Sequence, residues 1–159
     1  MRALYPGSFD PLTLGHLDIV QRASQIFGEV TILISNNPGK VAKINLEDRV
    51  KLIEAAIADL QNVNVKTTDG LTVDYALKNS YDFLLRGIRG AGDFESELEM
   101  SQINRALSKG LETIFLMTSP QNSFIRSSRV WELLEFGDAI EQLVPKNVAQ
   151  YLLANIPTQ

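Results

Sequence analysis

Short apolar runs alternate with longer amphipathic segments along the whole chain. Five runs are rich in branched and aromatic side chains and predict buried strands: Ala3–Tyr5, Val30–Ser35, Val63–Thr67, Phe83–Arg86 and Thr113–Met117. Helical segments lie between and after them: Leu14–Phe27, Leu46–Leu60, Thr72–Asn79, Asp93–Lys109, Ser128–Phe136 and Lys146–Ala154. This order predicts an α/β fold, a Rossmann-like, doubly wound, five-stranded parallel sheet with helices on both faces.

The first two helices carry the clearest local signals. Thr13 is placed to cap the first, whose apolar stripe near the 3.6-residue period runs through Leu17, Val20, Ser24 and Phe27, with Ile19, Ala23 and Ile26 beside it. Asn45 is placed to cap the second, whose stripe runs through Val50, Ile53, Ile57 and Leu60. We expect both stripes to face the sheet.

Composition narrows the class of protein. The chain has 159 residues, 45% of them hydrophobic, which fits a single domain spanning residues 1–159. A net charge of -4 without a long basic run argues against a nucleic-acid partner. The absence of cysteine excludes disulfides and fits a cytoplasmic location, and we expect no signal peptide and no membrane segment. With one histidine, we expect no zinc site or other protein-held metal; a metal would be magnesium arriving with phosphate.

In parallel sheets of this kind, ligands bind beyond the carboxyl ends of the strands, where the strand order reverses. The chain lacks the Gly-x-Gly-x-x-Gly fingerprint of dinucleotide-binding proteins and the Gly-x-x-x-x-Gly-Lys-Ser/Thr loop of P-loop proteins. A dehydrogenase or a P-loop kinase is therefore disfavoured.

The segment Tyr5–His16 follows the first strand and contains the only histidine. If Thr13 caps the helix, Gly15 and His16 fall in its first turn, where free amides and the helix dipole favour an anion. Gly7 and Gly15 remove side chains where a phosphate would approach the backbone. By itself this pattern also fits a histidine that merely caps a helix; otherwise it outlines a nucleotide site.

The loop after the fourth strand is the second candidate. It begins with Arg86 and Arg89 in a glycine-rich stretch and continues to Glu97. Guanidinium groups match phosphate oxygens, and neighbouring glycines let backbone amides join them. Two further loops leave the same edge of the predicted sheet, Ser35–Lys40 after the second strand and Asn122–Ser128 after the fifth.

Together these blocks resemble the nucleotidyltransferase superfamily with the (His/Thr)-x-Gly-His motif. Tyr-Pro-Gly-Ser-Phe-Asp-Pro at 5–11, Thr-x-Gly-His at 13–16 and Arg-Gly-Ile-Arg at 86–89 are closest to its phosphopantetheine adenylyltransferase family. Asp-Phe-Glu-x-Glu at 93–97, Gly-Leu-Thr-Val at 70–73 and the 122–128 segment extend the resemblance over nearly the full chain.

The resemblance implies a role for each block. Catalytic groups would be His16, Lys40 and Arg86. The phosphopantetheine acceptor would contact Ser8, Lys40, Leu71, Thr72 and Arg86. ATP would contact Ser8, Phe9, His16, Gly87, Ile88, Arg89, Glu97, Asn122, Ser123, Phe124, Ile125, Arg126, Ser127 and Ser128.

Two positions depart from the family pattern. The family usually continues after Lys40 with a basic residue, Pro and Phe, whereas this chain continues with Val41-Ala42-Lys43-Ile44, so Lys43 could share the role of Lys40. Arg126 stands where the superfamily has the first serine of Ile-Ser-Ser-Ser, and its contacts stay open.

The implied reaction transfers the adenylyl group of ATP to 4′-phosphopantetheine, with Mg²⁺ bound along with ATP. The resemblance further implies a homo-hexamer and coenzyme A as a feedback ligand. Two alternatives stay open at this point. One is a sibling enzyme acting on nicotinamide or nicotinate mononucleotide or on a small phosphoalcohol, and the other is a non-catalytic ATP-binding module.

Overall fold

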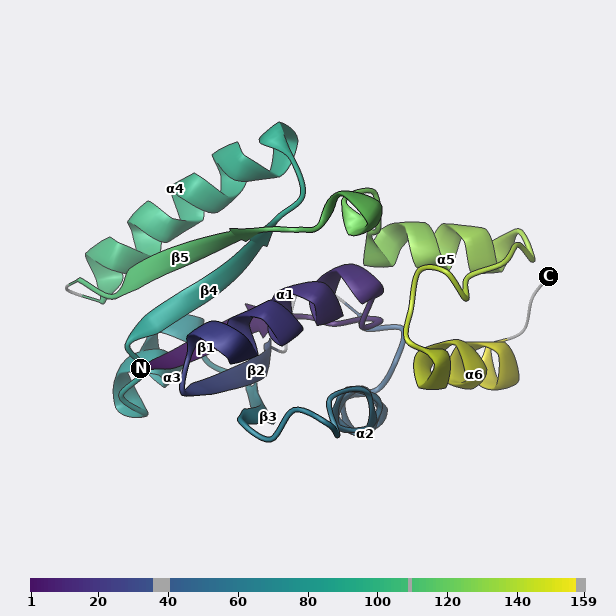
Figure 1. The fold of residues 1–159 in the computed structure, drawn as a ribbon, viewed down its shortest axis with the longest axis horizontal. Coiled ribbons are helices and arrows are strands. Elements are labelled where there is room, and N and C mark those ends of the chain that lie inside the picture. The colour runs from purple at the N-terminus through teal and green to yellow at the C-terminus, as the bar shows by residue number, and fades with distance from the viewer. Residues whose placement is uncertain (36–40, 109, 157–159) are drawn as a thin grey trace.

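The computed structural model describes residues 1–35, 41–108 and 110–156. Across these residues five parallel strands form one sheet in the order β3-β2-β1-β4-β5 (Figure 1). The strands are β1 (Arg2–Gly7), β2 (Glu29–Ser35), β3 (Val63–Thr68), β4 (Phe83–Ile88) and β5 (Glu112–Met117). The predicted fold class is confirmed. Each strand is extended by one to three residues beyond its apolar run, because backbone pairing continues where the apolar pattern stops.

The helices follow the predicted order. They are α1 (Leu14–Ile26), α2 (Leu46–Ala56), α3 (Thr72–Lys78), α4 (Ala91–Leu107), α5 (Ser127–Glu135) and α6 (Lys146–Asn155), with a 3-10 turn η1 (Pro120–Asn122) that the sequence pattern does not predict. Figure 1 shows α5 and α6 beyond the carboxyl end of the sheet, at the end of the molecule away from the N-terminus.

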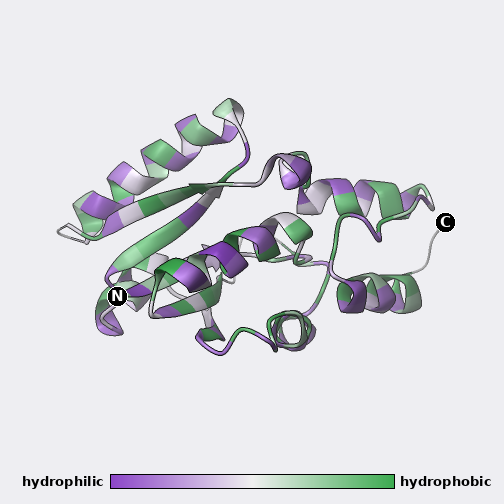
Figure 2. Ribbon diagram, viewed as in Figure 1, coloured by the Kyte–Doolittle hydropathy of each residue, from purple (hydrophilic) through white to green (hydrophobic). Residues whose placement is uncertain are grey.

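Two cores cover the two faces of the sheet. In β1, Ala3 and Tyr5 belong to the larger core, which α1, α2, α5 and α6 also enter, whereas Leu4 belongs to a smaller one shared with α3. In β2, Ile32 and Leu33 divide between the two cores in the same way. Successive side chains of a strand point to opposite faces of the sheet, and both faces are buried here, so the central strands have unbroken apolar sequences. Figure 2 shows the result, hydrophobic strands between helices of mixed colour.

The packed face of α1 agrees with the predicted stripe at Val20 and Phe27 and is centred on the side where Ile19 and Ala23 lie. The residues fully buried are Gly15, Ile19, Val20 and Ala23, with Phe27 just after the helix. Leu17 and Ser24 lie at its edge, and Ser24 instead offers its carbonyl to the Asn62 side chain. At Gly15 an added side-chain carbon would lie 3.5 Å from the Asn122 carbonyl, so the glycine lets the start of α1 pack closely against η1.

The reversal of strand order fixes where a ligand can bind. Chain connections from β1 lead to β2 on one side, while β4 lies on the other side of β1. The carboxyl ends of β1 and β4 therefore border the switch point of the sheet. Among the described residues, no helix is long and apolar enough to cross a membrane.

Candidate active site

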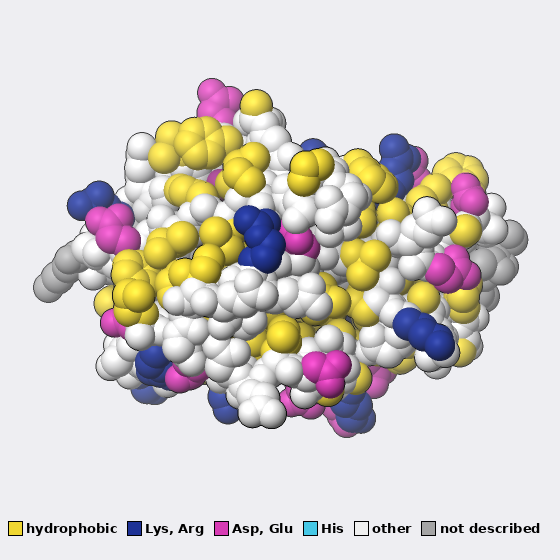
Figure 3. All heavy atoms as spheres, viewed as in Figure 1, with side chains coloured by type: hydrophobic (Ala, Val, Ile, Leu, Met, Phe, Trp, Pro, Cys, Tyr) yellow, Lys and Arg dark blue, Asp and Glu magenta, His cyan; other side chains and the backbone are white. Residues whose placement is uncertain are grey.

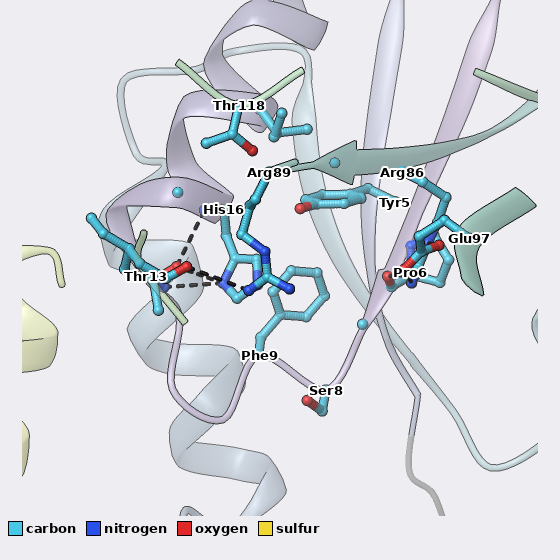
Figure 4. A pocket seen from close by; sticks show the side chains of 15 residues that line it. Tyr5, Pro6, Ser8, Phe9, Thr13, His16, Arg86, Arg89, Glu97 and Thr118 are labelled. Atoms are coloured by element: carbon cyan, nitrogen blue, oxygen red, sulfur yellow. Dashed lines mark hydrogen bonds and ion pairs between the residues drawn. The ribbon is translucent and has the colours of Figure 1, made fainter. Parts of the chain in front are cut away.

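A cavity of about 220 Å³ opens at this switch point (Figure 4). Its walls come from the end of β1, the first turn of α1, the end of β4 and the start of α4. The lining residues predicted from the sequence are Ser8, Phe9, His16, Arg86, Gly87, Arg89, Glu97 and Ile125. Segments more than a hundred residues apart in sequence thus meet at one edge of the sheet.

His16 is held by a reciprocal cap at the start of α1. The Thr13 hydroxyl accepts from the His16 amide at 3.3 Å, and the His16 ring Nδ1 accepts from the Thr13 amide at 3.1 Å. Because Nδ1 is an acceptor, the proton of the neutral ring resides on Nε2. The cap therefore leaves Nε2–H as the free donor of the ring.

The surroundings keep His16 neutral. Burial lowers its pKa to about 4, and the nearby Arg89 and Arg86 guanidinium groups act in the same direction. Edge-to-face contacts with Phe9, at 5.1 Å between ring centroids, and with Tyr5, at 6.5 Å, fix the plane of the ring. At neutral pH His16 is thus an oriented hydrogen-bond donor without a charge.

Close approach explains two glycines of the site. A side chain at Gly7 would meet the Phe9 ring at 3.0 Å, and one at Gly87 would meet Ile19 at 3.0 Å. Both glycines let aromatic or aliphatic walls close around the cavity. Their first role here is packing, which adds to the phosphate access expected from the sequence.

Arg86 of β4 and Arg89, which directly follows this strand, both form ion pairs with carboxylates of α4. Arg86 makes a bidentate ion pair with Glu97 at 2.5 Å and donates to the Pro6 carbonyl at 2.8 Å. Arg89 pairs with Asp93 at 2.6 Å and reaches the Ile125 carbonyl at 3.4 Å. Hydrogen bonds from Arg89 hold the pKa of Asp93 below its usual range. The guanidinium groups are therefore pre-positioned at the cavity wall.

A second cavity, of about 380 Å³, adjoins the first. Both share a wall of Pro6, Gly7, Ser8, Arg86 and Glu97. The second extends past Ser35 and Thr72 to residues of α4, namely Met100, Ser101 and Asn104, and to Thr113. Ser8, which the resemblance assigns to both substrates, and Arg86, which it assigns to the acceptor, thus lie in the wall between the two cavities.

Several predicted site residues line neither cavity. Leu71 is exposed, Ile88 is buried in the sheet, and Phe124 points to solvent. The others that line neither cavity are Asn122, Ser123, Arg126, Ser127 and Ser128. Their assignments to substrate stay predictions.

Within the 122–128 segment three side chains have other partners, and the Ser123 hydroxyl donates to the Pro120 carbonyl at 2.8 Å. The Ser127 hydroxyl donates to the Pro11 carbonyl at 2.9 Å, which ties α5 to the first loop. Arg126 is more than half exposed and lies 3.6 Å from Asp93. Asp93 thus faces two arginines, one inside the cavity and one outside it.

Of the two lysines that could hold the acceptor phosphate, the structure describes only Lys43. Lys40 lies outside the described residues. Lys43 pairs with Glu135 at 2.8 Å and sits over the Trp131 ring, and it lines neither of the two cavities. Its ammonium group is thus directed away from the site.

Sequence reasoning missed the residues that hold the loops in place. Thr118 lines the first cavity just beyond β5, where the rule on carboxyl strand ends could have found it. Asp18 accepts from the Ser119 amide and hydroxyl at 3.0 and 2.6 Å and fastens α1 to this loop. Asp10 accepts from the Lys43 and Ile44 amides. No local pattern marks such long-range pairs.

Comparisons with known proteins agree with this geometry. A family model described as cytidylyltransferase-like matches residues 4–133. The phosphopantetheine adenylyltransferase of Synechococcus sp. (strain CC9902) is 50% identical over 149 residues, which are 94% of this chain and 91% of that protein. The enzyme of the same name from Thermosynechococcus vestitus is 50% identical over 154 residues, 97% and 92% of the two chains.

A solved structure shares the fold. The putative nicotinate-nucleotide adenylyltransferase from Vibrio parahaemolyticus matches with a TM-score of 0.69 over 96% of this chain and 91% of that one, at 19% identity. At that identity the likeness concerns the fold alone. From the family model and the relatives together, this chain belongs to the cytidylyltransferase-like family and, within it, to the phosphopantetheine adenylyltransferases.

Proposed function

We propose that the protein transfers the adenylyl group of ATP to 4′-phosphopantetheine, giving dephospho-coenzyme A and pyrophosphate. The observation that carries this is the pair of adjoining cavities with Ser8 and Arg86 in the wall between them. ATP would occupy the cavity that contains His16, and the pantetheine arm the one that extends along α4. The two reacting phosphates would then meet at the shared wall.

The chemistry requires positioning more than proton transfer. An oxygen of the acceptor phosphate, already ionised, attacks the α-phosphorus while the bond to the β-phosphate oxygen breaks. Nε2–H of neutral His16 would donate to an α-phosphate oxygen and strengthen its bond as charge develops there. Arg86 and Lys40 would hold the acceptor phosphate, and Arg89 with the start of α5 the triphosphate.

We propose that magnesium enters with the nucleotide and neutralises charge on the pyrophosphate. Among the described residues, no group of three or more acidic or histidine side chains could hold a metal ion. Glu97 lines the first cavity, but Arg86 occupies both of its oxygens. These residues fit an ion coordinated chiefly by phosphate oxygens and water, as magnesium prefers.

We propose a homo-hexamer assembled partly through α4. Within the described part of the chain this helix buries none of its 17 residues. Its more sheltered positions are polar, Asp93, Glu97, Ser101 and Asn104, while Phe94, Leu98, Met100, Ile103 and Leu107 are exposed. Figure 3 shows hydrophobic side chains gathered in the region of α4 and β5. A second copy would cover such a face.

The remaining proposals follow from the substrates. Coenzyme A contains the same pantetheine arm and would compete for the second cavity as a feedback ligand. The reaction belongs in the cytoplasm, where ATP is available, and involves neither nucleic acid nor membrane.

Pyrophosphate release from ATP with magnesium tests the function. We expect release with 4′-phosphopantetheine and little with nicotinamide or nicotinate mononucleotide or a phosphoalcohol. Turnover with a mononucleotide and none with phosphopantetheine would identify a sibling activity instead. ATP binding without pyrophosphate release from any acceptor would identify a non-catalytic module.

A further inference from the structure

Arg49, on α2, is the one buried cation without a counter-ion among the described residues. Its exposed fraction is 3%, and no carboxylate of the residues that the structure describes lies within 4.0 Å of its guanidinium group. Within the described residues its side chain makes one hydrogen bond, from Nη1 to the Ser8 carbonyl at 2.8 Å. Its Nε is buried without a partner.

The other arginines show how unusual this is. Each of them pairs with a carboxylate in the described ranges, including the half-buried Arg86 and Arg89 of the site. A buried charge without a partner is strongly unfavourable, because neither water nor an opposite charge compensates it. An anion that is absent from the free protein would supply the missing compensation.

The position of Ser8 says where that anion would lie. The Ser8–Phe9 peptide is trans, so the Phe9 N–H points away from the carbonyl that Arg49 holds. Phe9 has a left-handed backbone with φ of 47°, and its amide has no acceptor among the described residues. Ser8 and Phe9 line the first cavity, whereas Arg49 lines neither cavity.

One peptide therefore separates the buried cation from the cavity. A hydrogen bond to the Ser8 carbonyl polarises that peptide and makes its N–H a stronger donor. Left-handed residues beside free amides form the backbone concavities that bind anions. Because Arg49 binds the Ser8 carbonyl, the Phe9 N–H on the opposite side of the peptide remains available to a ligand.

We propose that Arg49 is a positioning residue for the phosphate anion of the reaction. It locks the Ser8–Phe9 peptide with the Phe9 amide toward the cavity, and its own charge is compensated when a phosphate group binds on the opposite side of that peptide. This inference rests on the proposed nucleotidyl transfer.

Pyrophosphate is the probe, because every nucleotidyl transfer releases it whatever the acceptor. Calorimetric titration and thermal melting would compare the wild-type protein with Arg49→Gln, which keeps a donor but loses the charge, and Arg49→Lys, which keeps the charge. Lys51→Met is the matched control, since it removes an exposed positive charge from the same helix.

We expect Arg49→Gln to bind pyrophosphate about tenfold more weakly or worse, in line with loss of a charge-assisted interaction. Arg49→Lys should lie between it and the wild type, and the difference should shrink as salt is added. Lys51→Met should bind as the wild type does. A folded Arg49→Gln protein with wild-type affinity would overturn the proposal.

If Arg49→Gln does not fold, the kcat of Arg49→Lys tests the proposal instead. Loss of the bond that holds the Ser8 carbonyl should lower kcat about threefold or more while the melting temperature stays within a few degrees. An unchanged kcat would reject the positioning role. Failure of the wild-type protein to use phosphopantetheine would instead reject the proposed function and leave the pyrophosphate result standing.

Discussion

His16 contributes to the site through direction rather than charge. Its Nδ1 is occupied by the Thr13 amide, its ring is wedged against Phe9, and its pKa lies well below neutral. Such a group costs little reorganisation when a phosphate oxygen gains charge in front of it. The cap seen in the sequence as a structural alternative is thus the device that aims the donor.

We expect His16→Ala to lower kcat by about 10²–10³-fold, the usual loss for one preorganised donor to the transition state. The affinity for ATP should change much less, because the backbone amides of the first turn remain. Thr13→Ala is the control, since it removes the cap hydroxyl but keeps the amide that binds Nδ1, and it should cost less. Near-normal turnover of His16→Ala would show a capping role only.

The neutrality of His16 also predicts a pH dependence of stability. Its pKa is about 4 in the folded chain against an ordinary 6.5, so below pH 6.5 the unfolded chain takes up a proton that the folded chain does not. The contribution of His16 to the free energy of unfolding is fully present above pH 6.5 and falls by about 3 kcal/mol as the pH is lowered to 4. Urea unfolding of the wild type and His16→Gln across this window measures the difference. Parallel curves would contradict it.

At the scale of elements, the alternation of apolar runs was enough to predict every strand and helix of the sheet in order. Contacts between residues far apart in sequence then determined which face of each helix is buried, which the periodicity alone could not predict. The buried face of α1 includes the small residues Gly15 and Ala23. In α4, Glu97 and Asp93 turn inward because they pair with Arg86 of β4 and with Arg89 just after it. Arg49 escaped prediction for the same reason, since its partner lies 41 residues away.

The starts of α4 and α5 meet through Asp93, which faces Arg89 and Arg126. If Arg89 binds the triphosphate as proposed, the nucleotide would compete with Asp93 for it, and Arg126 would ease this by partly neutralising the carboxylate. We expect Arg126→Ser to weaken ATP binding about two- to fivefold, as for an exposed pair. The same change in an Asp93→Asn background should have no effect.

Calorimetry on the four proteins of this double-mutant cycle measures the coupling. Arg129→Ser, which removes another exposed arginine of α5, serves as the control. An equal loss of affinity in both backgrounds would mean that Arg126 contacts ATP directly and not through Asp93.

At the scale of the whole molecule, α4 has its polar residues on the sheltered side and most of its apolar residues on the exposed side. Its polar side borders the second cavity together with Met100, whereas Leu98, Ile103 and Leu107 are exposed in the described part of the chain. We expect Ile103→Glu to reduce the mass of the particle in sedimentation equilibrium, because a charge would be buried at the contact. Phe136→Glu, at an exposed apolar position away from α4, should leave the mass unchanged. An unaltered mass for Ile103→Glu would place the contact elsewhere.

The wall shared by the two cavities suggests how synthetic ligands could be linked across the site. Ser8 and Arg86 are reached from either side, so two small fragments, one in each cavity, would have their ends within a short linker of each other. Joining them turns the second binding step into an intramolecular one, with an effective concentration on the order of millimolar for a short flexible linker. Weak fragments would thereby yield a tight bivalent inhibitor, provided that the linker carries a negative charge past Arg86.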